Sequence, residues 1–166
     1  MDLYIVRHGI AIDREDPKCP SDPERYLTEE GIEKTKQIAK GLAALGATAD
    51  LFLSSPYVRA MQTAEICADA LEYPKAKIRR TDLLLPGAEP AMLFRELAKD
   101  KQSSSVFLFG HAPHMDDFIA HALKATAPFT ALKKSGVACL DIDSLSPLRA
   151  TLFWMLTSRI LRRLGD

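Results

Sequence analysis

Short apolar runs alternate with longer amphipathic stretches along this chain, and this arrangement predicts an α/β fold with a largely parallel sheet. The apolar runs are rich in Val, Ile, Leu and Phe, as buried strands are. We expect strands at residues 2–7, 51–53, 106–109, 137–142 and 150–156, and an edge strand at 76–80. The strands at 137–142 and 150–156 should form an antiparallel pair around a turn at Ser144 to Pro147.

The first helix has clear start and stop signals. Thr28 is a suitable N-cap for a helix that extends to about Leu45. Glu29 and Glu30 then fall in the first turn, where acidic side chains are favourable, and Gly46 ends the helix.

A second helix is expected to open at Ser55 and Pro56, as N-cap and first helical residue, and to run to about Leu71. Residues 10–26, which carry three prolines and many charges, are expected to form a loop. Further helices are expected at residues 90–100 and 114–124. The last ten residues should form a short amphipathic helix or a mobile tail.

The size and composition of the chain are those of one globular domain. It has 166 residues, of which 47% are hydrophobic and 27% charged, enough for a buried core. We therefore expect residues 1–166 to form a single domain. Basic and acidic side chains balance at 22 each, so no net field favours nucleic acid or an anionic membrane surface as a partner.

The cysteines and the first residues of the sequence bear on the compartment. Cys19, Cys67 and Cys139 are widely spaced and form no Cys-x-x-Cys pattern, so neither a disulfide framework nor a zinc site is indicated. The sequence starts with a strand-like run rather than a basic leader, and no stretch approaches the roughly 20 apolar residues of a membrane span. We expect a soluble, cytoplasmic protein.

Three of the expected strands end in polar residues that suit phosphate chemistry. Arg7-His8-Gly9 follows the first strand, Ser54-Ser55-Pro56 follows the second with Arg59 one turn further on, and Gly110-His111 follows the strand at 106–109. In open α/β sheets ligands bind beyond the carboxyl ends of the strands, so the three segments are expected to share one site. Arg7-His8-Gly9 alone would be weak evidence, because polar strand ends are common.

Arg59 is the residue that points most clearly to an anion. A cation in the first turn of a helix faces the positive end of the macrodipole, which disfavours it by about a few tenths of a kcal/mol. A bound anion would remove this conflict. Free helix N–H groups and arginine forks both match phosphate oxygens, so the segment indicates a phosphate site.

Two arginines, two histidines and a helix start directed at one point favour phosphoryl transfer through a histidine nucleophile. An imidazole attacks phosphorus only while one ring nitrogen is unprotonated, and neighbouring cations favour this neutral form. The same positive charges would stabilise the equatorial oxygens of the phosphoryl group as it passes from its donor to His8.

Four motifs occur in the stretch from residue 2 to about residue 123. They are Leu3-Tyr4-Ile5-Val6-Arg7-His8-Gly9, Leu27-Thr28-x-x-Gly31, Ser54-Ser55-Pro56-x-x-Arg59-Ala60-x-Gln62-Thr63-Ala64 and Gly110-His111. Their order and spacing resemble those of the histidine phosphatase superfamily. The short chain, His111-Ala112-Pro113 and the run toward Phe153-Trp154 are more similar to the SixA-like phosphohistidine phosphatases than to the longer phosphoglycerate mutases.

The resemblance implies a fold and a set of roles. The fold is a three-layer α/β/α sandwich around a mostly parallel sheet, like that of phosphoglycerate mutases, without metal or cofactor. His8 is implied to be the nucleophile that becomes phosphorylated, while Arg7, Arg59 and His111 hold the phosphoryl oxygens. Gly9 is expected to belong to the substrate-binding set, because it leaves room for the backbone to approach.

The chain departs from the mutase-like members in one respect. Those members carry a glutamate as general acid between the second arginine and the second histidine, in a motif that this chain lacks. Asp82 and Glu89 are the local carboxylates to consider for this role, although each is also explained as an ordinary loop or strand-end residue.

A weak or missing general acid favours a phosphoramidate substrate. An alkoxide leaving group needs a proton from a positioned acid, whereas the imidazole of phosphohistidine is easily protonated by solvent. The segment between Arg59 and Ser103 is too short for a large covering insertion, so an open site could admit a protein side chain. We therefore expect a metal-independent phosphatase that acts on phosphohistidine in a protein.

Two other functions remain open. One is a general phosphomonoesterase for small phosphorylated metabolites, which an acid within reach of a leaving oxygen would favour. The other is a non-catalytic module that binds phosphate or a phosphoprotein, against which the two histidines argue, because binding alone needs no nucleophile. The sequence does not determine the oligomeric state.

The remaining polar residues have ordinary explanations. His111 and His114 show an i, i+3 spacing that suits a metal, but no third ligand is obvious beside them. Ser135 is expected to support the site without acting in it. A basic cluster near the C-terminus is more readily a solvated surface than a contact for an acidic partner, and it consists of Arg159, Arg162 and Arg163.

Overall fold

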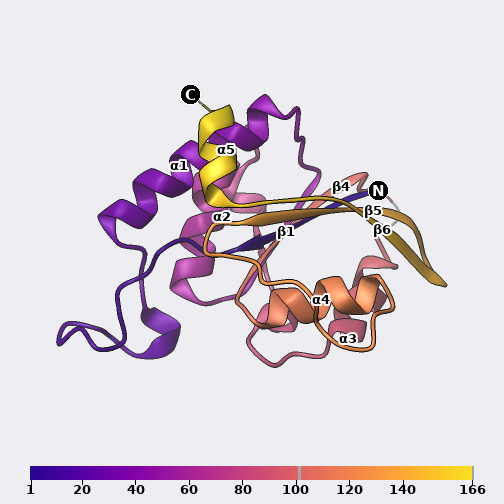
Figure 1. The fold of residues 1–166 in the computed structure, drawn as a ribbon, viewed down its shortest axis with the longest axis horizontal. Helices are drawn as coiled ribbons and strands as arrows, with labels where there is room; N and C mark the ends of the chain where they lie inside the picture. The colour runs from indigo at the N-terminus through magenta and orange to yellow at the C-terminus, as the bar shows by residue number, and fades with distance from the viewer. Residues whose placement is uncertain (101, 166) are drawn as a thin grey trace.

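A six-stranded sheet forms the centre of the computed structural model, which describes residues 1–100 and 102–165. The strand order is β3-β2-β4-β1-β5-β6 (Figure 1). The strands are β1 (Asp2–Arg7), β2 (Leu51–Ser54), β3 (Arg79–Arg80), β4 (Ser105–Gly110), β5 (Val137–Leu145) and β6 (Leu148–Leu156). Neighbouring strands are parallel from β3 to β1, whereas β5 is antiparallel to both β1 and β6.

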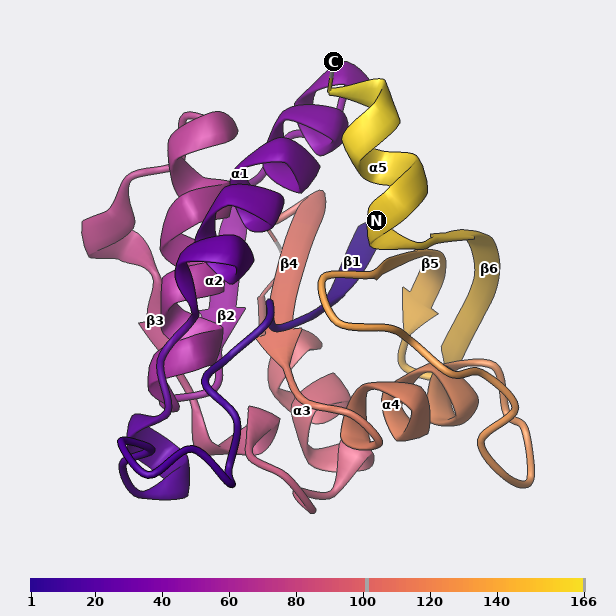
Figure 2. The same ribbon diagram turned by 60° about the vertical axis from the view of Figure 1, so that its left-hand side comes forward.

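Helices cover both faces of this sheet. They are α1 (Glu29–Ala44), α2 (Val58–Ala70), α3 (Pro90–Leu97), α4 (His114–Ala122) and α5 (Ser158–Leu164). In Figures 1 and 2, α1, α2 and α5 lie on one face, and α3 and α4 lie on the other. The predicted three-layer sandwich with a mostly parallel sheet is therefore confirmed.

The alternation of side chains along β1 explains its continuous apolar run. Tyr4 and Val6 belong to the core cluster shared with α1, α2 and α5, whereas Leu3 and Ile5 belong to the cluster shared with α3 and α4. Strands of parallel sheets are apolar throughout when both faces are covered. The same reasoning applies to β4, all of whose residues are buried.

The caps predicted for α1 are present. Thr28 Oγ1 accepts a hydrogen bond of 3.0 Å from the Gly31 N–H, and Gly46 takes a φ of +78° just beyond the helix. A left-handed conformation of this kind is open to glycine at little cost, so it lets the chain turn away from α1.

Three predicted elements are shorter in the structure. Only Arg79 and Arg80 of the expected edge strand pair with β2, because Lys75–Lys77 form a 3₁₀ turn after Pro74. α3 ends at Leu97 rather than at residue 100, because the Asp100 carboxylate accepts from the backbone of residues 102 and 103 in a turn. α4 ends at Ala122, and Lys124 then takes a φ of +55°.

The predicted loop at 10–26 is confirmed apart from a short turn, and of the two alternatives for the last ten residues the helix is present. Within the segment at 10–26, Asp22–Glu24 form a 3₁₀ turn. Ala11, near the start of the segment, pairs in an isolated bridge with Leu27, the residue that follows the segment. At the C-terminus the helical alternative is confirmed as α5, whose Leu161 is fully buried against α1 and α2. No helix in the described part of the chain is long and apolar enough to cross a membrane.

Candidate active site

The polar ends of β1, β2 and β4 meet at one edge of the sheet, as the sequence predicts. Arg7 at the end of β1 lies opposite Gly110 at the end of β4, and Ser54 of β2 lies opposite Phe109 on the other side of β4. The rings of His8 and His111, the residues that follow β1 and β4, lie 5.2 Å apart between their centroids. Both side chains are buried.

His8 is held in one tautomer by its own loop. Its Nδ1 atom lies 2.7 Å from the carbonyl oxygen of Gly9. Because a carbonyl oxygen can only accept, Nδ1 carries the proton and Nε2 keeps its lone pair. Burial lowers the pKa of His8 to about 3 and outweighs the opposing effect of the Gly9 hydrogen bond, and the charges of Arg59 and Arg7 lower it further. The imidazole is therefore neutral at physiological pH, the form that a nucleophile requires.

His111 is neutral for the same principal reason. Burial lowers its pKa to about 3, and the nearby groups His8 and Arg59 act in the same direction. Its Nε2 atom lies 2.8 Å from Ser55 Oγ, while its Nδ1 atom is buried without a hydrogen-bond partner among the described residues. The ring of Tyr57 lies 5.1 Å away and links His111 to Arg59, whose guanidinium carbon lies 4.9 Å from the Tyr57 centroid.

Both arginines donate hydrogen bonds through their terminal Nη atoms and leave Nε without a partner among the described residues. Arg7 Nη1 donates to the carbonyl oxygen of Leu132 at 2.8 Å. Arg59 Nη1 donates to the carbonyl oxygen of Asp22 at 2.5 Å, and Nη2 lies 3.2 Å from a carboxylate oxygen of the same residue. In each case Nε is buried and has no partner among the described residues. A buried donor without a partner costs free energy, and an oxyanion would satisfy it.

The sequence prediction for the start of α2 is wrong by two residues. The helix begins at Val58 with Tyr57 as its N-cap, not at Pro56 with Ser55. Ser55 instead continues the pairing of β2, because its N–H donates to Phe109, and its hydroxyl faces His111. Arg59 still lies in the first turn, and the Asp22 carboxylate, 3.2 Å from its Nη2 atom, offsets its unfavourable interaction with the helix dipole.

Gly9 is required by packing. A Cβ atom at this position would lie 2.6 Å from Thr35 Oγ1 and 3.1 Å from Leu27 Cδ2. The Gly9 N–H donates to Thr63 Oγ1, one turn beyond Arg59 on α2, at 3.0 Å. The loop that carries His8 is therefore tied directly to the helix that carries Arg59.

The two carboxylates considered as general acids lie on neighbouring segments. Asp82 starts a 3₁₀ turn (Asp82–Leu84), and Glu89 precedes α3. The charge of Glu89 acts to raise the pKa of His114, although burial is the larger effect and lowers this pKa overall. The role of Glu89 as an acid stays a prediction, as does that of Asp82.

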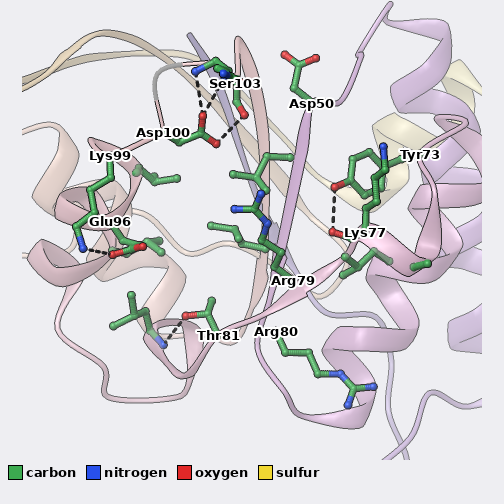
Figure 3. Close-up of a pocket in the computed structure, with 18 residues that line it drawn as sticks. Asp50, Tyr73, Lys77, Arg79, Arg80, Thr81, Glu96, Lys99, Asp100 and Ser103 are labelled. Carbon is green, nitrogen blue, oxygen red and sulfur yellow. Dashed lines mark hydrogen bonds and ion pairs between the residues drawn. The ribbon is translucent and has the colours of Figure 1, made fainter.

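A large groove of about 1070 Å³ lies elsewhere, along the β3 edge of the sheet (Figure 3). Arg79 projects into it between Tyr73 and Asp100. The Asp100 carboxylate accepts a hydrogen bond from the Ser103 hydroxyl. The four site residues do not line this groove. Over residues 1–100 and 102–165, no three His, Cys, Asp or Glu side chains gather as a metal site would require.

Comparison with known proteins identifies the family. The model of the histidine phosphatase superfamily (branch 1) matches residues 3–84, which contain the first three motifs. The chain belongs to the histidine phosphatase superfamily. An uncharacterized protein of Picosynechococcus sp. is 39% identical over 143 residues, which are 82% of each chain.

Two other members are informative. The structure of the protein histidine phosphatase SixA complexed with tungstate has a TM-score of 0.86, with 24% identity over 97% of this chain and 99% of that one. The mitochondrial serine/threonine-protein phosphatase Pgam5 of Drosophila pseudoobscura pseudoobscura is 36% identical over 86 residues, which are 52% of this chain and only 28% of that protein. The likeness to SixA shows the fold, and it covers nearly the whole chain.

Three groups of this candidate site could not be found from the sequence: the anchor Asp22, the hydroxyl of Ser55 and the carbonyl of Leu132. Ser55 stands inside the recognised motif, where the sequence favours a role as the N-cap of α2. Leu132 carries no local signal, because it acts through its backbone oxygen, and Asp22 carries none because only long-range folding brings its carbonyl and carboxylate to Arg59.

Proposed function

We propose that this chain is a metal-independent phosphatase that takes the phosphoryl group onto His8 Nε2 and then transfers it to water. The observation that carries the proposal is the state of His8: a buried, neutral imidazole with its lone pair on Nε2, beside two arginines with unpartnered Nε–H groups. Nucleophile and oxyanion donors of this kind are the two requirements of phosphoryl transfer.

In the first step, the His8 Nε2 lone pair forms a bond to phosphorus as the bond from phosphorus to the leaving group breaks. Arg7 and Arg59 donate to the equatorial oxygens through Nε. His111 donates a further hydrogen bond through the ring nitrogen that carries its proton. In the second step, water attacks phosphorus, the bond to Nε2 breaks, and inorganic phosphate leaves with His8 neutral again.

We propose phosphohistidine in a protein as the substrate. Cleavage of its P–N bond releases an imidazole that solvent can protonate, so the reaction needs no strong general acid. The likeness to SixA over the length of the chain supports this choice. The three unpaired cysteines fit a reducing compartment such as the cytosol.

A phosphate ester is the second candidate, favoured by the similarity to Pgam5, and Glu89 at the N-cap of α3 is the carboxylate that could serve it as an acid. Under this alternative Glu89 would protonate the leaving oxygen. A Glu89→Gln variant would then lose most ester hydrolysis while keeping phosphohistidine turnover.

The test compares phosphate release from a histidine-phosphorylated protein with release from a phosphoserine peptide and a small phosphate ester. We expect kcat/KM to be at least about tenfold higher with the phosphohistidine protein, unchanged by EDTA and absent in His8→Ala. Turnover of esters alone would overturn the substrate assignment. Tight phosphate binding with no turnover of any substrate would overturn the enzyme itself in favour of a binding module.

A further inference from the structure

Asp22 stands out among the charged residues outside the four-residue site, because three arginines converge on it. One carboxylate oxygen lies 3.1 Å from Arg14 Nη2 and 3.1 Å from Arg25 Nη1, and the other lies 3.2 Å from Arg59 Nη2. The Asp22 carbonyl oxygen also accepts from Arg59 Nη1. Asp22 therefore accepts hydrogen bonds from both terminal nitrogens of Arg59.

The segment that carries Asp22 is bonded within itself and joined to α2. Arg25 donates through Nε and Nη2 to the carbonyl oxygen of Ile12, and the Leu27 N–H donates to Gln62 Oε1 of α2 at 2.7 Å. Arg25 is nearly buried, with 13% of its side chain exposed. The position of Asp22 is thus determined by contacts on both sides of it.

The Arg59 atoms that face Asp22 determine which edge of the guanidinium is left for a ligand. With Nη1 and Nη2 facing Asp22, the unpartnered Nε–H marks the other edge of the guanidinium as the free one. Arg7 repeats this arrangement, since Nη1 is held by Leu132 while Nε is free. Asp22 therefore binds the terminal Nη atoms of Arg59 and leaves its Nε–H available.

We propose that Asp22 is a positioning residue, which holds the Arg59 guanidinium so that its Nε edge receives a phosphoryl oxygen. This inference rests on the proposed role of Arg59 as an oxyanion clamp. Without the carboxylate, Arg59 would keep one backbone bond and face the charges of Arg14 and Arg25, which would turn it away from the site.

The sign of the effect separates positioning from simple electrostatics. Asp22→Asn removes a negative charge beside the anion site, and that change alone would strengthen phosphate binding. A loss of affinity in this variant is therefore a specific sign of a misplaced Arg59. We expect about a tenfold loss, the equivalent of one charge-assisted hydrogen bond.

The test is calorimetric titration of inorganic phosphate into wild type, Asp22→Asn, Arg59→Ala and the double variant, with melting temperatures recorded to check folding. The inference predicts that Asp22→Asn binds phosphate about tenfold more weakly than wild type but that adding it to Arg59→Ala does not weaken binding further, and strengthens it if the lost charge matters. Arg14→Ala is the matched control, because Arg14 is 72% exposed, contacts only the other carboxylate oxygen and should bind like wild type.

Three results would overturn the inference. Asp22→Asn could bind phosphate as well as or better than wild type while Arg59→Ala binds poorly, which would leave the proposed clamp intact without Asp22. Asp22→Asn could weaken binding equally with and without Arg59, which would mean that it acts elsewhere. Full phosphate affinity in Arg59→Ala would remove the clamp, and the role of Asp22 with it.

Discussion

At the scale of single residues, the site depends on groups that burial keeps neutral or leaves unpartnered. His8 has 8% and His111 3% of its surface exposed, and desolvation is the largest cause of the low pKa of each. The carbonyl of Gly9 then selects which nitrogen of His8 is free. Nucleophilicity is thus set by the loop and the core around the residue, and not by a dedicated base.

This account predicts an unusual titration for His8. In nitrogen-detected NMR of the labelled protein, His8 should stay in the Nδ1–H tautomer from pH 8 to pH 5, consistent with a pKa of about 3. An exposed histidine would titrate near its reference pKa of about 6.5. A His8 signal that titrates near 6.5, or that shows the Nε2–H tautomer, would contradict the assignment.

Gly9 offers a second test at this scale. Gly9→Ala should lower the free energy of unfolding by about 1–3 kcal/mol, because the added methyl group meets Thr35 Oγ1 and Leu27. Urea denaturation measures this loss. Combining it with Thr35→Ala, which removes the closest atom, should cost less than the sum of the two single changes; strict additivity would show that the clash is not the cause.

At the scale of elements, local sequence signals predicted the central strands and the helix caps of α1, whereas long-range contacts determined the start of α2 and the anchors of the two arginines. The apolar runs predicted β1, β2 and β4 within about one residue, since burial on both faces leaves little freedom in composition. α2 starts two residues later than the sequence predicts, because Ser55 still pairs with β4 through its N–H and its hydroxyl contacts His111. Leu132 could not be predicted, because a backbone carbonyl leaves no trace in side-chain identity, and Asp22 could not be singled out among the many charged residues of the 10–26 segment before the fold brought it to Arg59.

The cap of α1 is a prediction that belongs to this scale. Thr28→Ala removes the acceptor for the Gly31 N–H and should lower the free energy of unfolding by about 1 kcal/mol. Thr28→Ser keeps the hydroxyl and should change stability much less. Chemical denaturation of the two variants decides the matter, and equal losses in both would show that the methyl group of Thr28 matters more than its cap.

For the whole molecule, the buried histidines make the stability of the fold depend on pH. The folded pKa of His8 and of His111 is about 3, below the unfolded value of about 6.5, so the unfolded chain binds more protons between these values. Their contribution is fully present above pH 6.5 and is lost as pH falls toward 3. The candidate site therefore also limits acid stability.

The free energy of unfolding should accordingly fall by about 2 kcal/mol for each of these histidines between pH 7 and pH 5. Urea melts at several pH values measure the slope. His8→Gln, which cannot be protonated, should reduce this slope by the share of one histidine. A slope unchanged by His8→Gln would mean that the pH dependence has another source.

The most direct test of the central claim is to look for the phosphoryl group on His8. The protein is mixed with a phosphohistidine protein, quenched in alkali within milliseconds, digested and examined by mass spectrometry. The account predicts an acid-labile phosphate on His8, formed and lost at rates that match turnover, and absent in His8→Gln. Full turnover with no phosphate on His8, or with phosphate on another residue, would contradict it.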